Sequence, residues 1–184
     1  MKKIIFCALL FSVFLVSNSE VNAQNSKRFA KLDVSPMDAA SYPSNWREAN
    51  KLVKIIYSRP QLKGRSLEKL APMDKVWRTG ANEAPEITFY SDVLFGGKKV
   101  SAGTYTLFTI PNSENWTVIL SNQKNIWGSY FYDEAQDVIR VTGNVSNSDE
   151  PIEVFSIAFE GENENATMYM GWDKKVVSVP VSKI

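Results

Sequence analysis

Residues 86–111 read EITFYSDVLFGGKKVSAGTYTLFTIP, and this stretch decides the fold class. Gly96-Gly97 stands between two short runs and predicts a tight hairpin, because glycine adopts the positive φ angles that two-residue turns need. The flanking runs Glu86–Ser91 and Thr104–Ile110 are typical of strands. Pro111 ends the second run, since proline cannot donate to a strand ladder. The stretch therefore predicts four short strands in close succession.

The remainder of the chain continues this pattern. Further strands are predicted at Lys51–Ser58, Trp116–Leu120, Ser129–Tyr132, Val138–Val145, Ile152–Glu160, Ala166–Trp172 and Val176–Val181, with a short edge strand at Leu32–Pro36. Turns recur about every 8–12 residues and long helical periods are missing. We therefore expect an all-β fold, a single antiparallel β-sandwich of jelly-roll or immunoglobulin-like arrangement. At most one or two short helical turns are expected, one of them capped by Ser66.

The first residues predict an export signal. Lys2 and Lys3 precede the apolar run Ile4–Val16, and Val21-Asn22-Ala23 fits a small-residue cleavage site. A transmembrane anchor is the alternative, but the run is roughly 13 residues long and a span needs about 20. We expect a cleaved signal peptide at 1–23, a flexible lead-in at 24–31 and a single domain at 32–184. The mature protein is then periplasmic or extracellular, with no stable membrane insertion.

Two absences limit the chemistry. Cys7 is the only cysteine, so a mature chain has neither a disulfide nor a thiol nucleophile. The sequence contains no histidine, which excludes the Ser-His-Asp and Cys-His classes and histidine-ligated zinc or iron. An enzyme of this composition has to use carboxylates, Tyr, Lys or Arg. We expect no cofactor, and any metal would be a hard ion bound by oxygen, such as calcium.

The charges are balanced. Removing Lys2 and Lys3 from the 21 basic residues and Glu20 from the 20 acidic residues leaves 19 of each. Basic stripes typical of nucleic-acid binding are not evident, so no nucleic acid is expected as a partner.

The sharpest candidate site lies in residues 76–83, VWRTGANE. Gly80 permits a turn that brings Arg78 near Asn82 and Glu83. A guanidinium beside an amide and a carboxylate binds sugar hydroxyls or a carboxylate group. The alternative is structural, with Arg78 paired to Glu83 and the loop pinned to the sheet. Trp77 is a candidate aromatic platform for the same ligand.

Three preceding residues are candidates for a cationic rim around an anionic ligand: Tyr57, Arg59 and Arg65. Their alternative roles are a half-buried tyrosine and arginines that stack on aromatics or face water. Trp127, followed by Gly128, Tyr130 and Tyr132, is a second candidate platform. Its alternative role is core packing, because aromatic residues bury the most apolar area per residue.

Carboxylate pairs offer a route to glycoside hydrolysis without histidine. Glu83 with Glu86, Asp74 or Asp92 are possible pairs, although their spacing carries no specificity. Another acidic group, Asp133, Glu134 and Asp137, does not match a calcium-loop pattern and is interpreted as a solvated turn.

Several motifs together resemble the bacterial family called domain of unknown function 2911. They are YSRPQLKGR (57–65), VWRTGANEA (76–84), GGKKVSAGTYTLFTIP (96–111), WTVIL (116–120), WG (127–128) and DVIRV (137–141). The resemblance covers roughly residues 33–181 and implies an exported β-rich protein. It carries no catalytic residues over to this chain. Ser101 and Met73 depart from the family pattern, both in turn regions.

These observations favour a binding module of the cell envelope for a small polar, anionic or carbohydrate ligand. A carboxylate-based hydrolase using Glu83 is the second hypothesis. The third is a structural or protein-interaction domain of an envelope assembly, whose protein partner is unknown.

Overall fold

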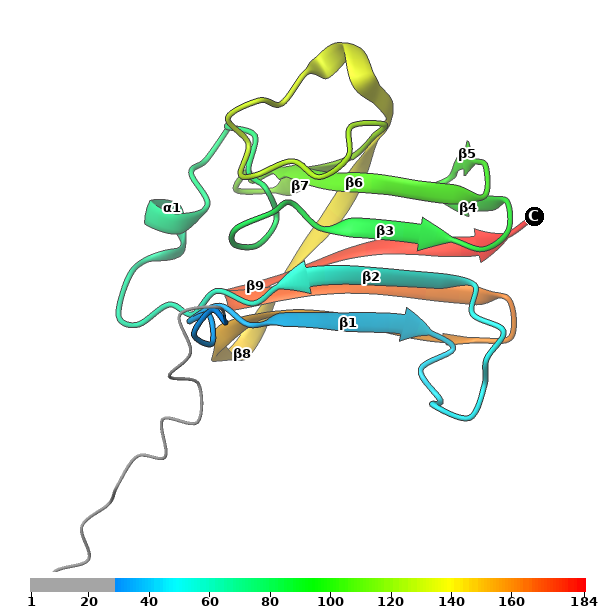
Figure 1. Ribbon diagram of the computed structural model, residues 1–184, viewed down its shortest axis with the longest axis horizontal. Helices are drawn as coiled ribbons and strands as arrows, with labels where there is room; N and C mark the ends of the chain where they lie inside the picture. Colours follow the sequence, from blue (N-terminus) through cyan, green and yellow to red (C-terminus); the bar gives the residue numbers. More distant parts are fainter. Residues whose placement is uncertain (1–28) are drawn as a thin grey trace, which may run out of the picture. The chain divides into compact units, whose positions relative to one another are not determined.

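Alternating apolar residues form the strands of an almost entirely β structure. The computed structural model describes residues 29–184, of which Asp33–Ile184 form a compact unit. The elements of this unit are β1 (Met37–Tyr42), β2 (Val53–Ser58), α1 (Leu67–Leu70), β3 (Glu86–Phe89), β4 (Val93–Phe95), β5 (Lys98–Val100), β6 (Gly103–Ile110), β7 (Asn115–Ser121), a 3₁₀ turn (Glu134–Gln136), β8 (Asp137–Glu162) and β9 (Asn165–Lys183). Figure 1 shows their arrangement. The predicted signal peptide at 1–23 lies outside the described residues.

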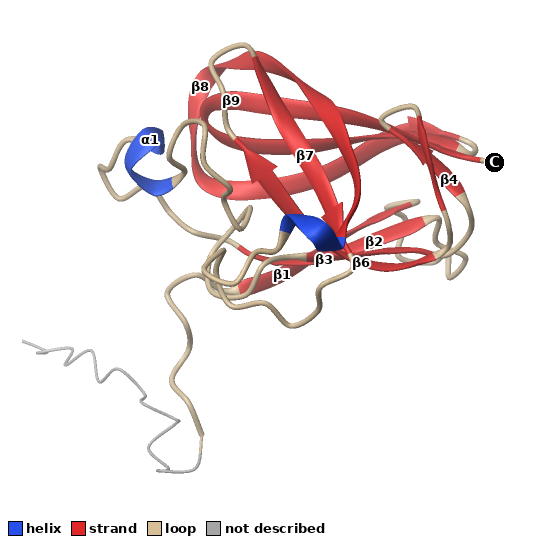
Figure 2. Ribbon diagram, turned by 90° about the horizontal axis from the view of Figure 1, so that it is seen from above, coloured by secondary structure: helices blue, strands red, loops and turns tan. Residues whose placement is uncertain are grey.

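All the strand pairs are antiparallel, and the nine strands join in one sheet with the order β1-β2-β3-β6-β7-β8-β9-β4-β5. β8 pairs with β7 through its first residues and with β9 over most of its length, with register shifts near Ile152. In Figure 2, β1, β2, β3 and β6 form one layer, and β7, β8 and β9 pass across it. The all-β prediction is confirmed, whereas the β-sandwich, of jelly-roll or immunoglobulin-like arrangement, stays a prediction.

The core lies between these layers. Val53, Ile55 and Tyr57 alternate into it from β2, as their two-residue spacing predicts, and Ile56 faces outward. Phe155 and Met168 meet them from β8 and β9. A smaller cluster of Ala84, Phe108 and Ile119 lies apart from the main core, with Ile126 and Tyr132 packed against it.

Three local predictions were wrong or incomplete. The first strand is Met37–Tyr42 and not the predicted Leu32–Pro36. Its sequence MDAASY lacks the β-branched residues that mark a strand, so the sequence pattern did not indicate it. Residues 129–132 form turns instead of a strand. The helical turn after Ser66 is present, but the Ser66 side chain makes no capping hydrogen bond.

The sheet has two edge strands, β1 and β5. β1 lies between Pro36 and Pro43, and β5 carries the exposed Lys98 and Lys99. Both edges are therefore short and bear prolines or charges, the features with which proteins limit unwanted strand pairing.

Candidate functional site

The VWRTG segment is a strand-like extension of the sheet. The Trp77 N–H donates to the Thr109 carbonyl at 2.7 Å, and the Thr109 N–H donates back at 3.0 Å. The hydroxyls of Thr79 and Thr109 are 3.0 Å apart in the interior. Gly80 turns the chain where any Cβ would lie 2.9 Å from the Ser58 carbonyl oxygen. Because neighbouring side chains alternate along such a segment, Trp77 and Thr79 face inward and Arg78 faces the other way.

Trp77 is part of the core and is not an open platform. Its side chain is 3% exposed and stacks on Trp172, with ring centroids 5.5 Å apart and planes inclined by 15°. Trp116 and Phe155 contact its edges. The prediction of Trp77 as a ligand-binding ring is therefore wrong, because the inward alternation set by Thr109 covers both of its faces.

The predicted pair of Arg78 with Glu83 is not formed. The four ion pairs found among residues 29–184 do not include Arg78. Its Nε atom is buried and has no hydrogen-bond partner in this part of the chain. Glu83 is exposed. The structural alternative, in which Arg78 pins the loop to the sheet by pairing with Glu83, is therefore not what the structure shows.

The cationic rim is not assembled either. Tyr57 is buried, and its hydroxyl accepts from the Ile157 N–H at 2.9 Å; burial raises the pKa of this phenol. The Arg59 guanidinium bonds to Asp38 at 2.9 Å, to Ser156 and to the Phe155 carbonyl. Arg65 donates to the carbonyls of Leu62 and Gln61. These contacts hold β2 and the following turn in place. Tyr57 is buried more deeply than its alternative role predicted, and the two arginines bond to backbone carbonyls where stacking on aromatics was the alternative.

Three of the predicted residues do come together. Glu83 and Trp127 form an antiparallel backbone bridge. The Gly128 N–H donates to the Asn82 carbonyl at 2.9 Å, and the Ala84 N–H donates to the Ile126 carbonyl at 2.8 Å. Segments that are more than 40 residues apart in the sequence thus lie side by side, and the backbones of Asn82 and Glu83 lie next to that of Trp127.

Exposed aromatic rings dominate this surface. Trp127 is 57% exposed, Tyr130 is 79% exposed and Phe131 is 75% exposed. We call Asn82, Glu83, Trp127, Tyr130 and Phe131 the aromatic loop surface. Its three aromatic residues belong to the long connection between β7 and β8, which extends from the sheet in Figure 1, whereas Asn82 and Glu83 belong to the segment before β3. The core-packing alternative for Trp127 does not apply, because most of its ring faces solvent.

The loop that carries these rings is held firmly. Gly128 has φ +69°, and a Cβ there would lie 2.7 Å from the Tyr130 ring, so the ring rests on this glycine. The Gln123 amide donates to the Phe131 carbonyl at 2.8 Å. The Tyr132 hydroxyl donates to Asp137 at 2.6 Å. These contacts fix both ends of the loop and lower the entropy cost of binding with it.

A polar cluster beneath the loop completes the anchoring. Arg140 donates to Asp137 at 2.7 Å and to the Tyr132 hydroxyl at 2.8 Å, and it pairs with Glu134 at 3.1 Å. Burial and the hydrogen bond to Asp137 raise the pKa of Tyr132 to about 12, although Arg140 opposes the shift. The hydrogen bond to Asp137 raises the pKa of Arg140. Arg140 therefore pairs with Glu134 and Asp137, two of the three acidic residues at which calcium was considered. The third, Asp133, caps the 3₁₀ turn.

Of the carboxylate pairs that the sequence suggested, one lines a shared cavity and the others do not. Glu83 and Glu86 line one cavity of about 200 Å³ together with Tyr57 and Asn125. Asp74 accepts a hydrogen bond from Asn112. Asp92 accepts from the Ala102 N–H in a turn. Only the first pair thus faces a shared space, among the pairs that the sequence suggested.

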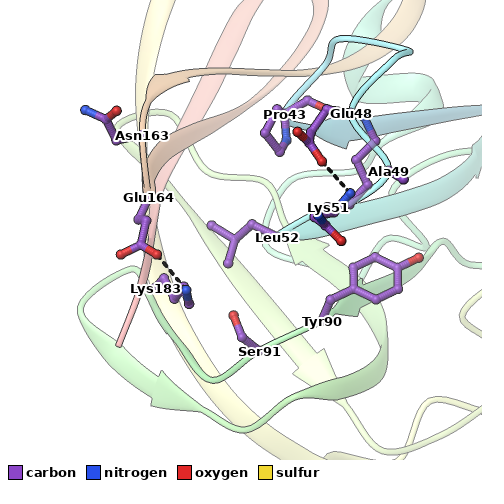
Figure 3. A pocket seen from close by; sticks show the side chains of 11 residues that line it. Pro43, Glu48, Ala49, Lys51, Leu52, Tyr90, Ser91, Asn163, Glu164 and Lys183 are labelled. Atoms are coloured by element: carbon purple, nitrogen blue, oxygen red, sulfur yellow. Dashed lines mark hydrogen bonds and ion pairs between the residues drawn. The ribbon is translucent and has the colours of Figure 1, made fainter.

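The structure also shows a cavity that sequence reasoning missed. It has a volume of about 570 Å³ and lies among the loop 43–52, the turn at Tyr90 and Ser91, and the end of β9 (Figure 3). Its residues come from four distant segments and form no local motif. The Lys51 and Lys183 side chains looked like ordinary surface lysines in the sequence.

Within residues 29–184, no group of three or more acidic, histidine or cysteine side chains is placed to hold a metal ion. No helix of this region has the length and hydropathy that crossing a membrane requires.

The fold and these surfaces define an all-β protein whose candidate sites lie in the connections between strands. The chain belongs to the family described as "Protein of unknown function (DUF2911)", whose family model matches residues 35–181. No curated protein and no solved structure gives a match to the chain.

Proposed function

We propose that this protein is a carbohydrate-binding module and that the aromatic loop surface is its site. The observation that carries the proposal is the backbone bridge between Glu83 and Trp127, which fixes an exposed indole ring beside an exposed carboxylate. Sugar rings present C–H faces that pack on aromatic rings and hydroxyls that bond to carboxylates and amides. The surface supplies both kinds of group within one short pair of segments.

The rings suit an oligosaccharide better than a single sugar unit. Trp127, Tyr130 and Phe131 lie within five consecutive positions, and all three are mostly exposed. Several exposed rings on one loop all bury apolar area only when the ligand extends over more than one of them. Rigid aromatic side chains also lose little conformational entropy on binding.

Titration of the full-length protein with a panel of hexasaccharides tests this proposal. The panel contains β-1,4-glucan, β-1,3-glucan, chitin and xylan fragments, with calorimetry as the readout. Trp127→Ala is expected to weaken the affinity about tenfold, which corresponds to about 1.4 kcal/mol. Trp46→Ala is the matched control, because Trp46 is 80% exposed and lies in another loop.

Two results would count against the proposal. One is the absence of binding to every member of the panel. The other is a hexasaccharide that binds the Trp127→Ala and Trp46→Ala proteins equally well, since the platform would then contribute nothing.

A second candidate function is carboxylate-based glycoside hydrolysis. The observation that favours it is the cavity of about 200 Å³ that Glu83 and Glu86 share. One acid would protonate the leaving group and the other would act as nucleophile or base. Hydrolysis of aryl glycosides that is lost in both Glu83→Gln and Glu86→Gln would support this function. Oligosaccharide binding without any turnover would leave the binding module as the better account.

We place this binding activity outside the cytoplasm, as a further part of the proposal. Its support is the sequence of residues 1–23, with two lysines, an apolar run and a small-residue site. Cell fractionation with an N-terminal sequence of the mature protein tests it, and a start at Gln24 is expected.

A further inference from the structure

The cavity at the end of the sheet is a built feature with fixed walls. The Tyr42 hydroxyl donates to the Asn163 carbonyl at 3.1 Å, which joins the end of β1 to the β8–β9 turn. The Tyr90 N–H donates to the Leu52 carbonyl at 2.9 Å. The Lys183 N–H donates to the Glu164 carbonyl at 3.0 Å. A volume of about 570 Å³ lies within the usual range for small-molecule sites.

Two lysines line this cavity and have unused donors. The Lys51 ammonium donates to the carbonyls of Pro43 and Asn45, and it has no ion-pair partner among residues 29–184. The Lys183 ammonium donates to Glu164 at 2.6 Å. An ammonium group has three donors, so one remains on Lys51 and two on Lys183. The position of Lys51 on neutral carbonyls leaves a positive charge that an anion would complement.

The other lining groups suit hydroxyls and a C–H surface. Glu48, Asn163 and Glu164 offer side-chain oxygens that accept hydrogen bonds. Tyr90 is 55% exposed and lines the wall with Leu52. Figure 3 shows Glu164 and Lys183 on one side of Leu52 and Tyr90 on the other. Lys51 and Glu48 lie on the same side of Leu52 as Tyr90. A ligand held here therefore meets a lysine and a carboxylate at each side, and a ring face on the side of Lys51.

We propose that this cavity binds a small polyhydroxylated anion, a sugar acid or a sugar phosphate. Its anionic group lies near Lys183, its hydroxyls bond to Lys51 and Glu48 across the cavity, and its C–H face packs on Tyr90. The site is separate from the aromatic loop surface in sequence and in chemistry. The proposal consequently stands or fails independently of oligosaccharide binding.

The test is titration of the full-length protein, followed by amide NMR shifts at Asn50, Ser91 and Glu164. The probes are glucuronate, glucose 6-phosphate, inorganic phosphate and glucose. One of the two hexose anions is expected to bind at least tenfold more tightly than glucose, and which one it is identifies the anionic group. Lys183→Met is expected to weaken this binding about tenfold, and raising the salt concentration is expected to weaken it as well.

Control variants keep the result interpretable. Lys51→Met also removes the two bonds to its loop, so Lys183→Met is the primary variant. Lys99→Met, on the exposed edge strand β5, is the matched control and should bind like the unmodified protein. Equal affinity for glucose, equal affinity for inorganic phosphate, no binding of either hexose anion, or unchanged binding in Lys183→Met would each overturn the proposal.

Discussion

The aromatic loop surface and the cavity at the end of the sheet are both made from connections between strands, but the ligands proposed for them would be held by different physical means. The aromatic loop surface presents three exposed rings on a pinned backbone, with Glu83 and Asn82 beside them. The cavity is concave and lined by side chains of both charges. Ring stacking depends on apolar contact and changes little with salt, whereas attraction to exposed lysines is screened by it. One scaffold can therefore carry a salt-insensitive and a salt-sensitive site.

The largest effect is expected when two tryptophans are compared. Trp77 is buried against Trp172 and Trp116, so Trp77→Ala should lower the free energy of unfolding by about 3–5 kcal/mol. Trp127 is mostly exposed, and Trp127→Ala should change it by about 0.5 kcal/mol or less. Urea denaturation of the two variants measures the difference. A large loss in Trp127→Ala would show that its ring supports the fold.

The second effect concerns the anchor of the aromatic loop. Arg140→Met leaves the Asp137 carboxylate, which is largely buried, with Tyr132 as its remaining side-chain partner. A loss of stability of about 1–3 kcal/mol is expected. The affinity for the oligosaccharide should fall as the loop loosens, while the affinity of the distant cavity stays the same. Arg47→Met, at an exposed arginine over Trp46, is the control. If the affinities of the oligosaccharide site and of the cavity fall equally, the cluster of Arg140, Asp137 and Tyr132 stabilises the whole sheet and not only the loop.

A third effect separates the two roles considered for Arg78. Because no carboxylate loses a partner, Arg78→Ala should change the free energy of unfolding by about 0.5 kcal/mol or less. Arg78 is not part of the aromatic loop surface, so the oligosaccharide affinity is expected to stay the same, and a drop in affinity would place Arg78 at the site. Chemical denaturation and calorimetry on the same protein samples measure both quantities. A loss of more than about 1 kcal/mol without any change in affinity would assign Arg78 to the fold.

The smallest effect is a pH dependence at the loop anchor. The pKa of Tyr132 is about 12 in the folded protein, against 10.0 for an ordinary tyrosine. The folded state thus holds a proton that the unfolded state releases, so this contribution to stability is complete below pH 10 and is lost as the pH rises toward 12. Tyr132→Phe should lose less stability than the unmodified protein across this interval. Parallel denaturation curves at several pH values measure it, and identical slopes would contradict the assignment.

Local sequence patterns were sufficient for much of the fold. The two-residue period placed Val53 and Ile55 in the core, and Gly96-Gly97 located the hairpin between β4 and β5. Strand β1 was missed, because its small and polar residues give no strand signal. Its position depends on pairing with β2, which is a property of the folded chain.

Local sequence patterns predicted the candidate sites less well than they predicted the strands. Trp77 and Trp127 both stand next to turn signals, and the sequence offered both as platforms. The pairing of Trp77 with Thr109 turns one indole inward, and the bridge to Glu83 leaves the other outside. The cavity near Lys183 had no local signal, because its walls come from segments that only the sheet order brings together.

The two edge strands have a consequence for how the protein behaves in concentrated solution. Fibril growth by addition of a strand from a second molecule requires a long, flat edge with free backbone groups. Pro36 and Pro43 limit the length of β1, and at the other edge an incoming copy of β5 would place Lys98 and Lys99 near like charges. The identity of a few edge residues thus disfavours the addition of a strand from a second molecule at either edge of the sheet.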